Sequence, residues 1–420
     1  MSIGLFIQEF LKRKGAYVFS SVVISKFLSL LLSVIILRIL SKEDYGNLIY
    51  AYTVISFIMP FMGMGVFQSF IKHAPIQDFL YQRKQLFKYT FFGGIIASII
   101  LIGIVIGFTP LITQQLPNSY WYLISFSALI LSLFIFESVK NYLRIFYLNK
   151  AFAKLEIIHS ILVFTLGAGL TYWVGAIGFI IALVSVPLAL SIYLLSKKRI
   201  ISATNYKFTF TKKSYWFYGI YTSLGGLVSQ LIFSVDIISI GNLLDNAKLI
   251  AQYKALSLIP FSLLFLPGAI IKTDFVKLVQ EAKNRAFLVD YVKNFMLIFL
   301  FASIGLISIV YFLDEWLISL IFGESYLEQV NLFMIFSVGI VGAFIFRVPF
   351  GNIMVAIGWT KISTLISVLT LFADVILNYF WIQKWGIQGA AYATSLLLWL
   401  SGLTAFIVFL VYIYRLKEKE

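Results

Sequence analysis

Lys26 lies in the middle of the first long apolar stretch of the chain, residues 17–40. A lysine at the centre of a membrane-spanning helix costs roughly 2.5–3.5 kcal/mol on insertion scales, so such a residue is a candidate for function. Beside it, four serines recur every fourth residue: Ser21, Ser25, Ser29 and Ser33. This spacing places them along one side of a helix, which predicts that this side faces a cavity or another helix. Lys26 is then either a cation that meets an anionic ligand or half of a structural ion pair.

Two aspartates lie within apolar stretches of the second half. Asp236 is the only acid in residues 215–240, and Asp374 precedes Asn378 by one helical turn in residues 362–382. Burial disfavours a charged carboxylate and a nearby cation favours it, and this combination suits a site that takes up and releases an ion. We therefore expect Asp236 and Asp374 to bind an ion, H⁺ or Na⁺. Asp236 could instead pair with Lys26, and a static structural pair is an equally good interpretation.

Basic residues at the ends of apolar stretches are a second group of candidates. Lys72, His73, Lys140, Arg144 and Arg347 lie where the preference for positive charge on the cytoplasmic side accounts for them unaided. Arg144 and Arg347 are nevertheless predicted to line an inward-facing vestibule that collects an anionic head group. Arg38 and Lys254 lie near the opposite ends, where the side chains reach the interface.

A mixed group of charged residues flanks the loop between the fourth and fifth apolar stretches: Glu137, Lys140, Lys154, Glu156 and His159. It favours a cytoplasmic charge network, with a proton relay as the alternative. The chain has two histidines, no cysteine and no metal-spaced cluster of His and Glu. Neither a catalytic residue nor a resident metal or cofactor is therefore expected.

Composition settles the class of protein that must position these residues. Of 420 residues, 61% are hydrophobic and 12% charged, with a mean hydropathy of +0.95. A spanning helix needs about 20 mostly apolar residues, and backbone groups in lipid must be paired within a helix. These rules predict an all-α polytopic membrane protein with about twelve transmembrane helices, at residues 17–40, 48–71, 89–108, 120–139, 157–174, 177–195, 215–240, 251–271, 294–313, 330–346, 362–382 and 389–414.

The distribution of basic residues gives the topology. Of the 33 Lys and Arg residues, 27 lie at the two termini or in alternate gaps between the apolar stretches. Positive residues remain on the cytoplasmic side, which predicts two cytoplasmic termini and an even number of spans. The net charge of +15 is spread over these segments, so it indicates orientation and contact with anionic lipid rather than nucleic acid. The first stretch contains Lys26 and lacks a cleavage site, so we expect it to remain as a membrane helix.

The chain divides into two similar halves around its longest hydrophilic interruption. Residues 197–214 form a predicted basic cytoplasmic linker between an N-terminal six-helix lobe (1–196) and a C-terminal six-helix lobe (215–420). Three matches recur in order at similar offsets: residues 40–43 with 244–247, Lys154 with Lys361, and 175–178 with 386–389. They predict a parallel repeat related by a pseudo-two-fold axis along the membrane normal. Transporters built from such repeats carry their substrate between the halves.

Short motifs that carry a family resemblance are spread over most of the chain, at residues 40–46, 236–253, 321–323, 356–358, 374–378 and 385–394. Together they resemble the bacterial polysaccharide flippases of the multidrug/oligosaccharidyl-lipid/polysaccharide (MOP) exporter superfamily. Asn378 matches an Asn that the family carries near the end of span eleven, whereas Asp374 has no matching position. The resemblance implies a two-lobed transporter of the inner membrane. It also implies a cationic cavity, in which Lys26 occupies a suitable place.

The resemblance implies the function as well. Such proteins flip lipid-linked, polyprenyl-diphosphate oligosaccharides to the outer leaflet, as in O-antigen or capsule assembly, and we expect Lys26, Arg144, Arg347 and Asn378 to contact that substrate. The expected partners are this lipid, membrane lipids and other polysaccharide-assembly proteins. The alternatives are a MOP-type exporter of small cationic drugs, whose cavity would be rich in acids, and a polytopic membrane enzyme that modifies glycans.

Overall fold

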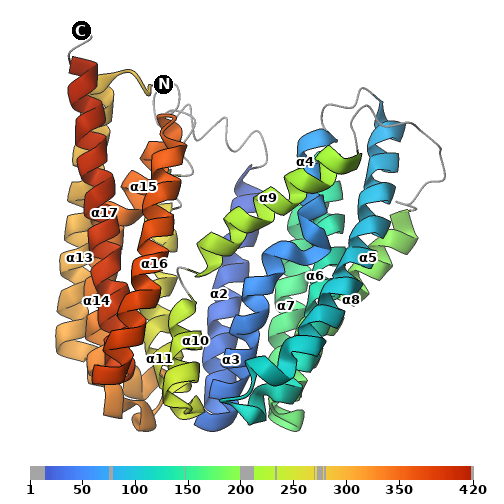
Figure 1. Ribbon diagram of the computed structural model, residues 1–420, viewed down its shortest axis with the longest axis horizontal. Coiled ribbons are helices and arrows are strands. Elements are labelled where there is room, and N and C mark those ends of the chain that lie inside the picture. The colour runs from blue at the N-terminus through green and yellow to red at the C-terminus, as the bar shows by residue number, and fades with distance from the viewer. Residues whose placement is uncertain are drawn as a thin grey trace. The chain divides into compact units, whose positions relative to one another are not determined.

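A computed structural model describes residues 15–74, 79–146, 148–198, 212–231, 234–268, 270–271, 278 and 281–417. Every regular element among these residues is a helix (Figure 1). Ten of the described helical segments are long and apolar enough to cross a membrane. The prediction of an all-α polytopic fold is confirmed.

The helices form two compact units, Met1–Gln230 and Leu231–Glu420. The first unit contains, in chain order, α2 (Gly15–Ile39), α3 (Lys42–Ile58), η1 (Met59–Gly65), α4 (Val66–His73), α5 (Leu80–Ile112), η2 (Pro117–Ser119), α6 (Tyr120–Ile145), α7 (Asn149–Val174), α8 (Ala176–Lys198) and α9 (Lys212–Leu231). Its core is a cluster of aromatic and aliphatic side chains from α4, α5, α6, α7 and α9. Because lipid is itself apolar, close packing rather than escape from water holds these helices together.

The second unit begins with α10 (Val235–Leu244). It continues through α11 (Ala247–Ser262), α13 (Arg285–Ile321), η3 (Glu324–Gln329), α14 (Asn331–Gly342), η4 (Ala343–Arg347), α15 (Val348–Ala356), α16 (Thr360–Trp385) and α17 (Ile387–Lys417). A separate core, centred on α13, α14, α15 and α17, holds it together. Each of the twelve predicted spans overlaps one or more of the helices of the two units.

The second predicted span is broken in its middle. Pro60 opens the short η1 segment, and Gly63, Met64 and Gly65 all adopt left-handed backbone angles. Gly65 has no substitute there, because a Cβ would collide with Ser223 Oγ and with the carbonyl oxygen of Gly219 in α9. Broken helices are tolerated in membranes where neighbouring groups pair the freed backbone, and Ser98 Oγ does so by accepting the N–H of Gly63 at 2.9 Å.

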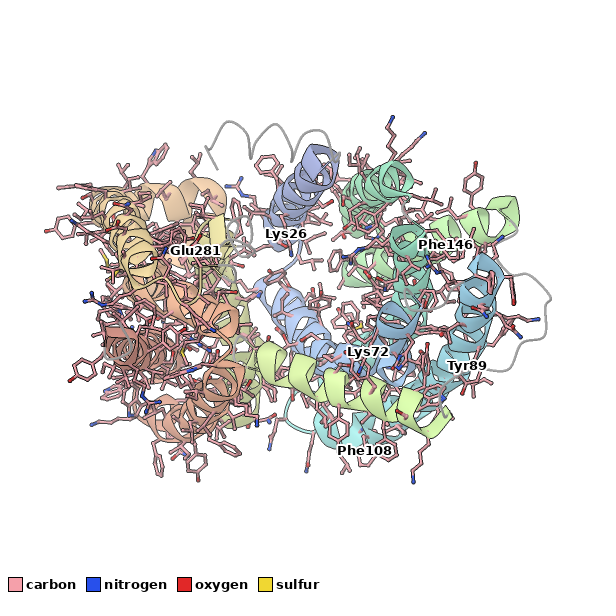
Figure 2. All side chains as sticks on the ribbon, turned by 90° about the horizontal axis from the view of Figure 1, so that it is seen from above. Lys26, Lys72, Tyr89, Phe108, Phe146 and Glu281 are labelled. Carbon is pink, nitrogen blue, oxygen red and sulfur yellow. The ribbon has the colours of Figure 1, made fainter. Side chains whose placement is uncertain are left out.

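Helix α9 packs on the first unit, although residues 215–230 were predicted to belong to the C-terminal lobe. Tyr215 is fully buried, its hydroxyl lies 2.6 Å from Thr90 Oγ1, and its carbonyl accepts a bond from Ser69 Oγ at 2.6 Å. Seen from above in Figure 2, Lys72 and Tyr89 lie beside this helix, and Trp216 Nε1 donates to Tyr89 Oη at 2.8 Å. The packing therefore divides the chain after Gln230. Most of the linker, residues 199–211, lies outside the described residues, and its role stays a prediction.

Local structure at the repeated motifs agrees with an internal duplication. Helices α7 and α16 each have 26 residues, and each ends at a glycine with positive φ, Gly175 (+73°) and Gly386 (+58°). In both turns the N–H of the third following residue returns to the glycine carbonyl, at 2.9 Å for Gly178 and 3.0 Å for Gly389. The turn between α7 and α8 therefore has the same form as the turn between α16 and α17, which lies 211 residues later in the chain.

Candidate functional site

Asp236 is the centre of a buried polar cluster in the second unit. It lies in the first turn of α10 and is 3% exposed. Its Oδ2 accepts hydrogen bonds from Tyr253 Oη at 2.5 Å and from Thr394 Oγ1 at 2.6 Å. Asn378 Nδ2 donates to its Oδ1 at 2.7 Å. Three donors and the positive end of the α10 dipole therefore stabilise negative charge on this carboxylate.

Asp374 joins the same cluster through Asn378. The Asn378 amide nitrogen donates to Asp374 Oδ1 at 3.2 Å, one turn back along α16, while it also donates to Asp236. Asp374 is 3% exposed and Asn378 is not exposed at all. One amide thus bridges two buried carboxylates, which we name the carboxylate pair.

The carboxylate pair has no basic partner among the residues that the structure describes. The ion pairs that Lys140 forms with two glutamates lie in the first unit. Lys254 follows Tyr253 in α11 but forms no ion pair with Asp236 or Asp374. In addition, the buried Asn378 Oδ1 has no hydrogen-bond donor. Carboxylate, amide and hydroxyl oxygens are the donors that hard cations prefer, so the cluster suits a cation better than an anion.

A small pocket connects this cluster with Arg347. Its lining comes from η4, α16 and α17: Arg347, Thr370, Leu371, Asp374, Thr394, Leu397, Leu398 and Ser401. The guanidinium is half-buried, and its Nη2 donates to Ser367 Oγ at 3.0 Å. Arg347 and Asp374 therefore line the same pocket. The predicted role of Arg347, to line an inward-facing vestibule, does not account for this position by itself.

From the sequence, the tenth span was predicted to cover residues 330–346 and to end just before Arg347. The predicted end of this span was wrong. The helix continues to Ala356, with a π-helical segment from Ala343 to Arg347 in its interior. Pro349 explains the irregularity, because it has no N–H to bond the carbonyl four residues earlier. Such π-helical insertions frequently mark functional positions.

The remaining predicted substrate contacts lie in the first unit. Lys26, on α2, is exposed and forms no ion pair with an acid of that unit among the described residues (Figure 2). The neighbouring Ser25 instead faces α7, where Ser160 Oγ lies 2.7 Å from its hydroxyl. Arg144 is exposed near the end of α6, with its guanidinium 5.9 Å from the Phe152 ring centre. The pairing of Lys26 with Asp236 stays a prediction.

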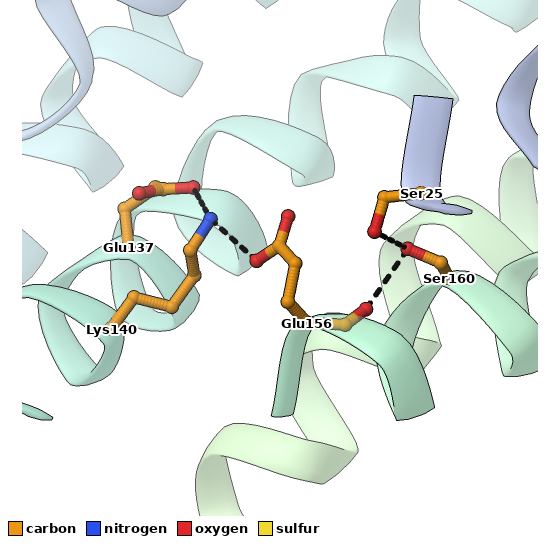
Figure 3. Close-up of polar contacts among 5 residues, drawn as sticks. All are labelled: Ser25, Glu137, Lys140, Glu156 and Ser160. Atoms are coloured by element: carbon orange, nitrogen blue, oxygen red, sulfur yellow. Dashed lines mark hydrogen bonds and ion pairs between the residues drawn. The ribbon is translucent and has the colours of Figure 1, made fainter. Parts of the chain in front are cut away.

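The charge network predicted between spans four and five is present around Lys140 (Figure 3). Its amine lies 2.8 Å from Glu137 Oε1 on α6 and 3.0 Å from Glu156 Oε2 on α7. Ser160 Oγ lies 2.9 Å from the backbone carbonyl of Glu156 within α7, and its 2.7 Å contact with Ser25 Oγ links α7 to α2. Of the other two predicted members, Lys154 is exposed and His159 stacks on Phe136 with 4.5 Å between the ring centres. The network joins three helices of the first unit close to Lys26.

Replacing Lys140 with Met is expected to destabilise the first unit by about 2–3 kcal/mol. Removing one partner of a fully buried pair costs roughly 3–5 kcal/mol, and the value here is reduced because the Glu137 side chain is 31% exposed. The measurement is the thermal unfolding of purified protein in detergent. Lys154→Met, which changes an exposed lysine of the same unit, serves as the control and should shift stability by less than about 0.5 kcal/mol. Equal melting of the two variants would contradict a structural network.

Sequence reasoning found Asp236, Asp374 and Asn378 but did not assign Tyr253 and Thr394 to the site. Both are neutral, so they do not stand out in an apolar stretch as a charged residue does. They did stand within two of the motifs that carried the family resemblance, residues 236–253 and 385–394. Polar residues inside such motifs were therefore the signal that could have found them.

The sequence also matches a family model described as "Polysaccharide biosynthesis protein", over residues 11–268. The chain belongs to this family. The prediction that it is a polysaccharide flippase relative within the MOP superfamily is thereby confirmed.

Individual relatives agree with the family. Over 193 residues the chain is 30% identical to a Shigella flexneri protein assigned as an O-antigen transporter, and the match spans 44% of each protein. Its fold is similar to that of the lipid II flippase MurJ in an inward closed conformation, with a TM-score of 0.73, 16% identity and coverage of 94% of this chain and 88% of MurJ. An inward-facing multidrug transporter of the MATE family, in the MOP superfamily, gives a TM-score of 0.67 at 13% identity, with coverage of 94% and 96%.

The ten apolar helices and the family match bear on two further predictions. The chain is a multi-pass membrane protein. The family and the relative named as an O-antigen transporter support the prediction that the chain is not an enzyme. At these identities the solved structures establish the fold alone, and substrate and driving ion need a separate argument.

Proposed function

We propose that this protein flips polyprenyl-diphosphate-linked oligosaccharides from the inner to the outer leaflet of the bacterial inner membrane. The observation that carries the proposal is the match to the polysaccharide biosynthesis family over more than half of the chain. The O-antigen transporter relative and the MurJ-like fold support it. In this proposal both termini are cytoplasmic, and other polysaccharide-assembly proteins supply and consume the lipid.

The substrate is anionic at its diphosphate, so its binding surface has to be cationic. Lys26, Arg144 and Arg347 are the proposed contacts. Lys26 carries most of this role, because its exposed ammonium is not neutralised by an acid of its own unit among the described residues. Asn378, which was predicted as a substrate contact, is fully buried between the carboxylates, and we assign it to ion binding instead.

The carboxylate pair is the proposed coupling site, with H⁺ or Na⁺ as the driving ion. Two like charges that share one amide repel each other, and a bound cation relieves that repulsion. The cluster joins α10, α11, α16 and α17, so ion occupancy changes how tightly these four helices hold together. A ligand shifts a conformational equilibrium only if it binds one of the two states more tightly than the other. In this proposal the cation binds more tightly to the state in which these four helices meet at the cluster.

The test is flipping of a polyprenyl-diphosphate oligosaccharide by purified protein in proteoliposomes. Flipping should depend on the protein and accelerate when an inward Na⁺ or H⁺ gradient is imposed. Failure with several such lipids, together with gradient-driven efflux of small organic cations, would replace this proposal with a drug exporter. Flipping that ignores every gradient would leave the substrate assignment in place and remove the coupling role of the carboxylates.

A further inference from the structure

Arg347 and the carboxylate pair share one pocket without forming an ion pair. The lining includes Arg347, Asp374 and Thr394, and the Thr394 hydroxyl donates to Asp236. The guanidinium is held by Ser367 instead of by a carboxylate. Opposite charges therefore face the same space and remain separated.

The position of Arg347 is fixed by a chain of polar contacts. Ser367 Oγ, which accepts from the guanidinium, donates to the Ser363 carbonyl at 3.1 Å. Ser363 Oγ in turn donates to the carbonyl of Gly351 at 3.3 Å, one turn beyond Arg347 along its own helix. Ser367 and Asp374 are seven residues apart on α16, which is roughly 10 Å along the axis. The residue that holds the arginine is thus about two turns of α16 from Asp374.

The charges that meet in this pocket do not cancel. Two carboxylates and one guanidinium leave one net negative charge when all are ionised, and among the residues lining the pocket Arg347 is the basic one. One monovalent cation at the pair brings the total to zero. The acceptor-rich surroundings, with Asn378 Oδ1 lacking a donor, suit a metal cation such as Na⁺.

We propose that Arg347 is the built-in counter-charge of the carboxylate pair, which limits the site to one monovalent metal cation and keeps the cation's affinity low enough for release. This inference rests on the proposed ion coupling and names what regulates it. A coupling site must bind its ion well enough to load and weakly enough to unload. At roughly 10 Å and an effective dielectric constant near 20, removing the repulsion from Arg347 is expected to tighten cation binding about ten-fold.

The experiment is a calorimetric Na⁺ titration of the purified full-length protein in detergent, with choline as the balancing cation. Arg347→Gln is expected to bind Na⁺ about ten-fold more tightly than the unaltered protein, which should bind one Na⁺ per chain. Arg347→Lys keeps the charge and should bind as the unaltered protein does. Adding Asp374→Asn to Arg347→Gln should abolish binding. Damage to the fold weakens binding, so a gain in affinity separates the charge effect from a structural one.

Two results would overturn the inference in distinguishable ways. Equal or weaker Na⁺ affinity in Arg347→Gln, with binding intact in the unaltered protein, would remove Arg347 from the ion site and leave the coupling proposal standing. Absence of Na⁺ binding in the unaltered protein would defeat sodium coupling itself, and the counter-charge role with it. A flipping assay driven by an H⁺ gradient alone then decides whether the flippase proposal survives with a proton.

Discussion

Asp374→Asn is expected to abolish the acceleration of flipping by an ion gradient while the protein remains folded. The substitution keeps the shape of the side chain and an oxygen that can accept the single 3.2 Å bond from Asn378. It removes one of the two negative charges that bind the cation. A ligand at one site typically changes the affinity of a second, coupled site by about 5–150-fold. We expect Asp374→Asn to reduce the acceleration by the gradient by about 100-fold, because this charge is half of the ion site. The measurement is flipping in proteoliposomes with and without the gradient.

The control for this variant is Asp290→Asn, which makes the same change at an exposed aspartate of α13 in the same unit. It should flip at the rate of the unaltered protein. Asp236→Asn is a poorer probe, since Tyr253 and Thr394 donate to one carboxylate oxygen and Asn378 to the other, so the amide N–H groups would have to face one of these donors. Leaving buried donors unpaired costs roughly 1–3 kcal/mol and would confuse lost coupling with lost stability. A full gradient response in Asp374→Asn would exclude the carboxylate pair from coupling.

Hydrophobicity and charge distribution were sufficient to predict the helices, because lipid leaves a spanning backbone no other way to pair its polar groups. The same rules could not predict how a helix is broken. The left-handed turn at Met64 and the π-helical segment that ends at Arg347 depend on single glycines and prolines packed against other helices. A hydropathy window averages over such residues, which is why the tenth span was predicted to end ten residues before Ala356.

The candidate site could be predicted in part for a related reason. Charged residues are rare in apolar stretches, so Asp236 and Asp374 could be identified one at a time. Their meeting through Asn378 could not, because a helical period shows which residues share a face and not which face of another helix it meets. Tyr253 and Thr394 are ordinary residues for a membrane helix. Only the packing of α10, α11, α16 and α17 reveals them as partners of a carboxylate.

Lys26→Ala is expected to lower flipping of the lipid-linked oligosaccharide by about 10–100-fold, with or without an ion gradient. A hydrogen bond to a charged group contributes roughly 1.5–3 kcal/mol, which corresponds to this range for one ammonium contact with a diphosphate. The exposed side chain of Lys26 forms no ion pair with an acid of its own unit among the described residues, so its removal should leave the packing of α2 unchanged. The measurement is flipping in proteoliposomes, alongside thermal unfolding in detergent.

Charge, rather than shape, should decide the outcome at this position. Lys26→Arg is expected to keep most of the flipping rate, and Lys26→Met, which retains the length without the charge, should fail as Lys26→Ala does. Lys154→Ala, at an exposed lysine on α7 of the same unit, provides the matched control and should flip normally. Because Lys26 acts on the substrate and Asp374 on the ion, the response to a gradient should persist in the residual activity of Lys26→Ala and disappear in Asp374→Asn. Normal flipping by Lys26→Ala would remove this lysine from substrate binding and leave Arg144 and Arg347 as the proposed cationic contacts.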